Sequence, residues 1–210
     1  MRIALALLLA SSCAFAAEAK LEKAAVRPDP QTLQRGAETA VTQCLGCHGL
    51  KYLKYRDLAK IGFTKDKVDA LLASQGLDAP LASQMPAGAA LQSFGIVPPD
   101  LSLITKAREG GPSYVYSFLL GFYVSPQGAG DNHVFPGTKM PDILGVSGVS
   151  DAAQRSELQN KARDVASFLA WAADPRAEER HTLGYYVIGY LALLTAMLYI
   201  MKRRIWGKLK

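Results

Sequence analysis

A run of uncharged residues near the C-terminus, 183–201, constrains this chain more than any other feature. At 1.5 Å per residue, nineteen residues form a helix about 28 Å long, close to the hydrocarbon thickness of a bilayer. Four tyrosines lie toward its ends, where rings favour the headgroup region, and Lys202, Arg203 and Arg204 follow at once. The sequence therefore predicts a transmembrane helix over 183–201 and a cytoplasmic basic tail over 202–210. The main part of the chain, before the helix, is predicted to lie on the opposite side of the membrane from the tail. A helix buried in a soluble core would need an apolar partner segment, which the sequence lacks.

The N-terminus has the pattern of a secretory signal. Met1-Arg2 precedes the short apolar run 3–9, and small residues end the segment at Ala14-Phe15-Ala16. We expect residues 1–16 to be cleaved, because the apolar run is too short to span a bilayer. Cys13 then leaves with the signal. The alternative, a lipoprotein cut just before Cys13, fits the preceding Ala10-Ser11-Ser12 poorly.

The positive charge of the chain is confined to its two ends. The formal net charge is +6, and six cations account for it: Arg2 in the predicted signal and Lys202, Arg203, Arg204, Lys208 and Lys210 in the tail. The stretch between them is neutral overall, which argues against a nucleic-acid-binding face. The three cysteines cannot form a disulfide scaffold in a chain of 210 residues.

Between the two ends the pattern is mainly helical. We expect an exposed lead-in over 17–30 and one domain over 31–176. Apolar periodicity and capping residues predict four helices: 32–44, 64–76 with Thr64 as N-cap, 113–122, and 151–173 with Ser150 as N-cap. The Pro- and Gly-rich stretches 77–100 and 123–149 are predicted to be long loops. We also expect the first and last helices to pack together, with Gly36 and Ala40 facing Phe168 or Trp171.

The motif Cys44-Leu45-Gly46-Cys47-His48 carries the chemistry. C-x-x-C-H is the attachment pattern of c-type haem: two thiols one turn apart reach the two vinyl groups, and the histidine that follows binds the iron. A zinc site would need further ligands close by, but His133 and His181 are distant in the sequence. A thiol-exchange motif would need a βαβ context, which a mostly helical chain lacks. We therefore predict one covalent haem.

The residues alone leave the second axial ligand open. Methionine is commonly the second axial ligand of the iron in an electron-transfer haem. Met85 and Met140 are the two methionines outside the predicted signal and membrane helix. Each precedes a proline, which would stiffen the loop that holds it. Composition does not choose between them, although Met140 comes just before the last helix of the domain, where a wrapped chain would return to the haem. Either methionine could instead fill the core, and His133 is a further candidate.

Several segments in order resemble the cytochrome c1 family. The haem motif is followed by Leu50-Lys51-Tyr52 and Tyr55-Arg56 and preceded by Leu33-Gln34-Arg35-Gly36. The segments 94–102, 114–123, 132–141 and 168–172 and the single C-terminal span continue the similarity, from about residue 29 to the end. The resemblance implies a mainly α, class I cytochrome c-like haem domain with long loops and one C-terminal transmembrane helix. It also implies His48 as proximal ligand, Met140 as distal ligand, and a haem pocket lined around Pro98-Pro99 and Phe135-Pro136.

The resemblance further implies a role in electron transfer. The chain would accept one electron from a Rieske iron-sulfur protein and pass it to a soluble c-type cytochrome, beside cytochrome b in a dimeric quinol:cytochrome c oxidoreductase. It would lie in a bacterial inner membrane with its haem domain in the periplasm, and it would have no catalytic site of its own. The family's Arg-Ala-Asn-x-Gly-Ala stretch is replaced here by residues 91–96, so an arginine that could pair a propionate is missing.

Two alternatives follow from the same haem chemistry. A membrane-anchored cytochrome that donates to a terminal oxidase, or to another quinol complex, would have the same haem site and different partners. A haem sensor would keep an open sixth position, and its reduced form would bind carbon monoxide.

Overall fold

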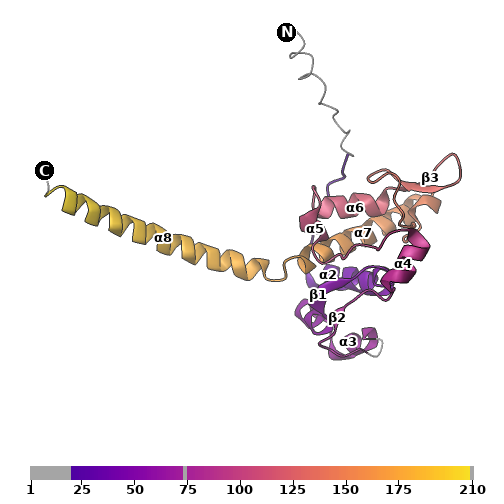
Figure 1. Cartoon of the computed structure of the whole chain (residues 1–210), viewed down its shortest axis with the longest axis horizontal. Coiled ribbons are helices and arrows are strands. Elements are labelled where there is room, and N and C mark those ends of the chain that lie inside the picture. The colour runs from indigo at the N-terminus through magenta and orange to yellow at the C-terminus, as the bar shows by residue number, and fades with distance from the viewer. Residues whose placement is uncertain (1–19, 73–74, 209–210) are drawn as a thin grey trace, which may run out of the picture. The chain divides into compact units, whose positions relative to one another are not determined.

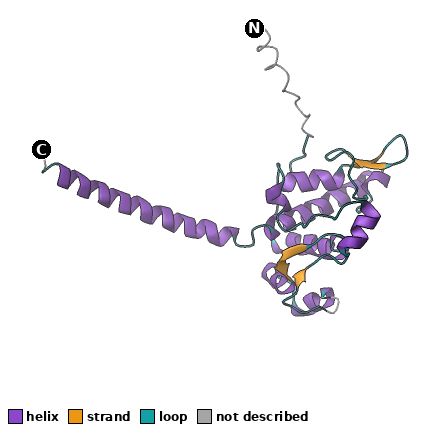
Figure 2. Cartoon of the chain, in the orientation of Figure 1, coloured by secondary structure: helices purple, strands orange, loops and turns teal. Residues whose placement is uncertain are grey.

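The computed structural model describes residues 20–72 and 75–208, so the predicted signal over 1–16, including Cys13, lies outside the described residues. The chain divides into two compact units, Met1–Ala173 and Asp174–Lys210. Helices dominate both (Figure 1), and the strands form only two small antiparallel pairs in the described ranges (Figure 2), which confirms the mainly α fold class. The elements of the first unit are α2 Pro30–Thr39, η1 Ala40–Cys44, β1 Leu50–Lys54, η2 Tyr55–Ile61, α3 Lys65–Leu71, β2 Pro80–Leu81, α4 Ala87–Phe94, α5 Ile104–Ala107, α6 Pro112–Leu120, β3 Phe122–Val124, β4 Gly130–Asn132, η3 Val146–Gly148 and α7 Ala152–Ala172.

The centre of the first unit is the contact between α2 and α7, which lie against each other (Figure 1). Asp29 caps α2 by accepting a hydrogen bond from the Thr32 backbone N–H, and Pro30 occupies the first turn. Gly36 makes the approach possible, because a Cβ built there would lie only 2.1 Å from the carbonyl oxygen of Asp164 on α7. Phe168 faces Gly36 and is fully buried. The predicted packing of the first and last helices is therefore confirmed.

An ion pair at the same helix contact holds α2 and α7 in register. The guanidinium of Arg35 contacts both carboxylate oxygens of Asp164, with Nε–Oδ2 at 2.6 Å and Nη2–Oδ1 at 3.3 Å. Asp164 is buried and Arg35 half exposed. A forked contact of this kind fixes orientation as well as supplying attraction.

Helix α6 packs on the other side of α7 and ends earlier than the sequence suggested. The ring centroids of Tyr114 and Phe118 lie 6.1 Å apart and those of Phe118 and Phe122 5.4 Å apart, as expected for residues spaced by four. The prediction that the helix continues to residue 122 is wrong, however. The helix ends at Leu120, and Phe122 begins β3, where it pairs with Asn132 of β4.

Three further expectations about local structure need correction. The predicted loop 77–100 contains α4, because Pro86 precedes its first turn and Gly95, with φ of 72°, ends it, so these two residues are helix boundaries rather than loop markers. The cap of α7 is Asp151 rather than Ser150, since the Asp151 carboxylate accepts from the Gln154 N–H. Thr64 does cap α3, but that helix ends at Leu71 and not at residue 76.

The lead-in has no helix or strand over residues 20–28, yet its backbone is hydrogen-bonded to the domain. Three serine hydroxyls on α6 and α7 accept from it: Ser117 from the Glu22 N–H at 2.8 Å, Ser113 from Ala24 at 3.1 Å, and Ser167 from Arg27 at 3.1 Å. The segment therefore lies along two helices through its main chain, while most of its side chains face solvent.

The second unit is formed mainly by one helix, α8 Ala177–Trp206. It is long and apolar enough to cross a membrane, with a mean hydropathy of 1.7 over its best window and no part of that window buried within the chain. The helix extends beyond the predicted span 183–201 at both ends, so Lys202, Arg203 and Arg204 belong to its last turns. The Lys202 ammonium lies 5.9 Å from the centre of the Trp206 ring.

Candidate haem-binding site

The C-x-x-C-H motif forms one tight turn at the end of the first helix. Helix α2 passes into η1, a π-helical turn, where the Leu45 N–H bonds the carbonyl of Ala40 at 3.0 Å. The N–H groups of Cys47 and His48 then both bond the carbonyl of Cys44, at 3.0 and 2.8 Å. π-Helical turns such as η1, which are wider than α-helical turns, are frequent at functional sites. Here the turn gathers both thiols and the imidazole at one point of the fold.

The imidazole of His48 has a defined hydrogen bond. Its Nδ1 lies 2.7 Å from the carbonyl oxygen of Pro99. Because a carbonyl only accepts, Nδ1 must carry the proton, which leaves the lone pair of the neutral ring on Nε2. Burial lowers the pKa of His48, while the Pro99 carbonyl and the Asp100 charge act in the opposite direction. A ring oriented and polarised in this way is the usual arrangement of a metal-binding histidine.

The environment of the Cys44 thiol does not favour thiolate chemistry. Cys44 and Cys47 are both partly buried. Burial raises the pKa of Cys44 to about 11, with Lys161 opposing the shift and Cys47 adding to it. Cys44 is therefore a protonated thiol at neutral pH, unlike the activated cysteines of redox enzymes. Within residues 20–72 and 75–208 no group of three Cys, His, Asp or Glu side chains gathers as a metal site would require.

Two loops are hydrogen-bonded to the attachment turn. In the first, the Ser83 hydroxyl donates to the carbonyl of Cys47 at 2.9 Å, and the Gln84 N–H donates to the carbonyl of Leu45 at 2.8 Å. In the second, the Leu101 N–H donates to the carbonyl of Gly49 at 2.7 Å. The turn is thus fixed through its backbone carbonyls, independently of its side chains.

Asp100 is a structural residue that the motif analysis did not assign. Its Oδ2 accepts from the Lys51 N–H and its Oδ1 from the Ser102 N–H, both at 3.0 Å. The carboxylate therefore joins the Pro99 loop to the strand after His48. The Asp-x-Ser pattern at 100–102 suggests such a local turn, but only the fold shows that the Lys51 N–H completes it. No signal in the sequence pointed to Ser83.

The candidate axial methionines occupy different surroundings. Met140 is partly buried against the hydrophobic core, which Cys44 and Leu101 also contact. Met85 is partly buried on the Ser83 loop, where its own N–H donates to the Ser83 hydroxyl at 3.1 Å. His133 is exposed, and its ring stacks on Tyr123 with centroids 4.1 Å apart.

Apolar side chains also lie on the loops expected to line the haem pocket. Ile96 and Val97, next to Pro98-Pro99, are each 50% exposed, and Phe135 is 47% exposed. Large apolar side chains that remain exposed on these loops are available to contact an apolar ligand. The donor set and these loops together fit a c-type haem.

Comparison with known proteins supplies the family. The model of the cytochrome C1 family matches residues 20–85 and 75–209. The chain belongs to the cytochrome c1 family. A cytochrome c1 from Rhodospirillum rubrum is 33% identical over 233 residues, covering 88% of this chain and 84% of its own length. The mitochondrial heme protein cytochrome c1 1 of Arabidopsis thaliana is 33% identical over 211 residues, covering 87% and 68%. A protein of Nitrosomonas europaea named ammonia monooxygenase gamma subunit is 30% identical over 228 residues, covering 96% and 95%.

Membership of the cytochrome c1 family settles the general nature of the protein. Its cofactor is a c-type haem, and it is an electron-transfer subunit of the bc1 complex. With α8 it is a membrane-anchored member of that family.

Proposed function

We propose that this cytochrome c1 takes one electron from a Rieske iron-sulfur protein and passes it to a soluble c-type cytochrome. The hydrogen bond from His48 Nδ1 to Pro99 is the observation that carries the proposal, because it leaves Nε2 available to iron beside two attachment thiols. The haem, when bound, supplies a one-electron couple. The chain contributes a fixed ligand geometry, so that oxidation and reduction need little rearrangement.

Each site residue has a separate role in this proposal. Cys44 and Cys47 would hold the haem through thioether bonds to its two vinyl groups. His48 would be the first ligand of its iron and Met140 the second. The buried contact of Arg35 with Asp164 and the close approach at Gly36 keep α2, which leads into the attachment turn, in place on α7.

The choice of Met140 over Met85 rests on how each methionine is connected to the attachment turn. The loop of Met85 is bonded to the turn that carries His48, through Ser83 to Cys47. Met140 comes from a separate loop and packs against the core that Cys44 also contacts. A second ligand supplied independently of the His48 turn is therefore better matched by Met140, as the resemblance to the family also implies.

The topology follows from the two ends of the chain. We infer a cleaved signal over 1–16, a single anchor formed by α8, and a cytoplasmic tail. The anchor would cross a bacterial inner membrane, with the haem domain on its periplasmic side. Quinol oxidation belongs to cytochrome b and the Rieske protein, the partners that we propose within a dimeric complex. The chain itself then has no catalytic site.

The decisive experiment is purification in mild detergent through an affinity tag on this chain. Addition of quinol should reduce the covalent haem, and a cytochrome b and a Rieske protein should co-purify. If the chain purified with a terminal oxidase or with a monooxygenase instead, and its haem stayed oxidised in quinol, the proposed partners would be wrong while the haem site would stand.

The distal ligand is tested by two matched variants, Met140→Ala and Met85→Ala. We expect the Met140 variant to bind carbon monoxide tightly in its reduced form, because the sixth position is opened. The Met85 variant should keep the weak binding of the native chain. The reverse pattern would assign Met85 as the ligand.

A further inference from the structure

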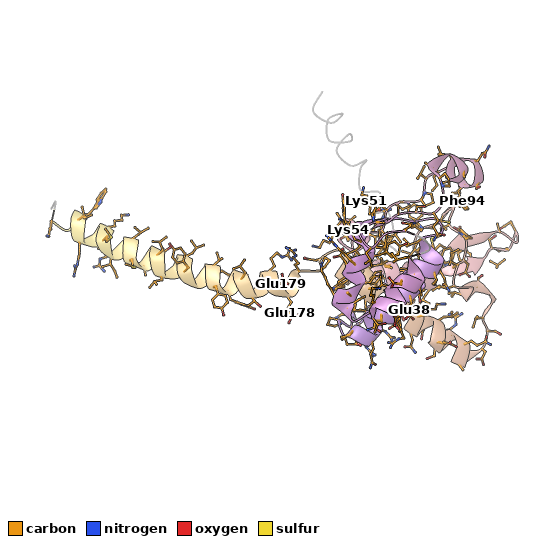
Figure 3. The ribbon with its side chains drawn as sticks, turned by 90° about the horizontal axis from the view of Figure 1, so that it is seen from below. Glu38, Lys51, Lys54, Phe94, Glu178 and Glu179 are labelled. Atoms are coloured by element: carbon orange, nitrogen blue, oxygen red, sulfur yellow. The ribbon has the colours of Figure 1, made fainter. Side chains whose placement is uncertain are left out.

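The strand that follows the attachment turn presents cations to solvent. Lys51 comes three residues after His48, and Lys54 and Arg56 follow it from β1 into η2. Lys51 is exposed, while 44% of the Lys54 side chain and 58% of the Arg56 side chain remain accessible. Figure 3 shows Lys51 and Lys54 on the same side of the domain. We call Lys51, Tyr52, Lys54 and Arg56 the cationic strand face.

The carboxylates close to this face do not neutralise it. Asp78 is shared by two cations, with its Oδ1 at 2.6 Å from Arg56 Nη1 and 3.8 Å from Lys54 Nζ. Asp100 contributes one further negative charge, and both its oxygens accept hydrogen bonds from backbone N–H groups, so the three cations of the face outnumber the two carboxylates. Among the described residues Lys51 has no ion pair, and its ammonium lies 5.2 Å from the centre of the Tyr52 ring.

The surroundings of the attachment turn add no net negative charge. Residues 79–99, which include residues of both loops bonded to the turn, contain no charged side chain. Lys161, on α7, is close enough to Cys44 to act on its thiol. Asp57 is balanced by Lys60, whose ammonium lies 2.8 Å from its carboxylate. With that pair set aside, the cations Lys51, Lys54, Arg56 and Lys161 are set against the carboxylates Asp78 and Asp100, and the balance of these six groups is +2. A haem bound through its vinyl groups at Cys44 and Cys47 would carry its two carboxylates on the opposite half of the ring, so the balance counts protein groups alone.

The face also carries the aromatic surface that protein interfaces favour. Tyr52 is 62% exposed, the most exposed large hydrophobic side chain between residues 20 and 173 in the described part of the chain. Leu77, 42% exposed, lies next to Arg56, whose N–H bonds its carbonyl at 3.0 Å. Exposed aromatic residues and arginine are enriched where proteins dock on one another.

We propose that the cationic strand face is the docking surface for the soluble electron acceptor, and that this acceptor presents an acidic face. The proposal rests on the proposed function, since it specifies the partner of the same haem site. The step it serves is a single-electron transfer: this chain loses one electron, the acceptor gains one, and no bond is made or broken. Complementary charge would steer the two proteins together with their haem edges close.

The test measures the rate at which the reduced holo-chain, in detergent, reduces two oxidised partners. The partners are an acidic and a basic small c-type cytochrome of similar reduction potential, mixed by stopped flow at several salt concentrations. Reduction of the chain with ascorbate makes the measurement independent of quinol, so failure of the quinol experiment and failure of docking remain distinguishable.

The variants place the same charge change at two sites. Lys51→Glu combined with Lys54→Glu reverses the face, and Lys51→Gln combined with Lys54→Gln gives a milder form in case the first does not fold. Lys65→Glu combined with Lys67→Glu on α3 is the control, because both lysines are exposed and are paired with Asp69 and Glu38 respectively. Haem content normalises all rates.

We expect the native chain to react faster with the acidic cytochrome, and its rate to fall as salt rises. Reversal at Lys51 and Lys54 should lower that rate about tenfold at low salt, within the range of electrostatic steering, whereas the matched double reversal at Lys65 and Lys67 should change it less than about twofold. The proposal is overturned if the charge-reversed variant reacts at the native rate, or if the native chain reacts faster with the basic cytochrome.

Discussion

Replacement of Gly36 by alanine should destabilise the haem domain, although alanine is the better helix former. The new Cβ would lie 2.1 Å from the Asp164 carbonyl oxygen, 2.6 Å from its carbon and 2.8 Å from the Cβ of Phe168. Ordinary contact begins near 3.4 Å, so α2 and α7 must separate by about 1.3 Å. Two of the three atoms are backbone and cannot rotate away.

The expected size of the effect comes from two opposing contributions. Overpacking of this kind costs about 1–3 kcal/mol and at times more, and removal of a helical glycine returns about 0.5–1 kcal/mol. Because the clash is with backbone, we expect the upper end of that range, a net loss of about 2 kcal/mol. For a domain of this size that lowers the melting temperature by about 4–8 °C.

The assay is thermal unfolding of the holo-chain in detergent, followed by circular dichroism. Gly88→Ala is the matched control: Gly88 lies in α4, where a Cβ would meet nothing within 4 Å, so this variant should be unchanged or slightly more stable. If Gly36→Ala melted at or above the native temperature, the close contact of α2 with α7 would be refuted.

Two further outcomes follow from single contacts. The Ser117 hydroxyl bonds both the N–H and the carbonyl of Glu22, so Ser117→Ala should release the lead-in and speed tryptic cleavage after Lys23 about fivefold, for a loss of about 1 kcal/mol; unchanged cleavage would contradict the docked lead-in. N–H groups of Asn132 and Gly137 hold the pKa of Asp131 below its ordinary 3.8. The stabilisation they give is therefore present above pH 3.8 and is lost as the pH falls through the lower folded value. In a plot of melting temperature against pH, Asp131→Asn should therefore show a shallower fall on the acid side than the native chain. Parallel curves for the two proteins would contradict this.

Local sequence patterns were sufficient for features that depend on neighbours in the chain. The membrane helix follows from length and hydropathy, the helices near Pro30, Lys65 and Ala152 follow from periodicity and caps, and the haem motif follows from the spacing of three residues. All of these are properties of a few consecutive turns. Two of the misjudged boundaries, at α4 and at the end of α6, are places where proline and glycine could mark either a loop or the ends of a helix; the end of α3 and the cap of α7 were each misplaced by a small number of residues along a continuous pattern.

Contacts between distant segments were decided only by the tertiary structure. Nothing local links His48 to Pro99, Cys47 to Ser83, or Glu22 to Ser117, because each hydrogen bond joins residues between 36 and 95 positions apart. Chemistry at a motif can be inferred from side-chain types at short spacing. Orientation of the imidazole, support of the attachment turn and the charge that surrounds it depend on which loops the core brings together, and that arrangement is fixed by the packing of α2 on α7.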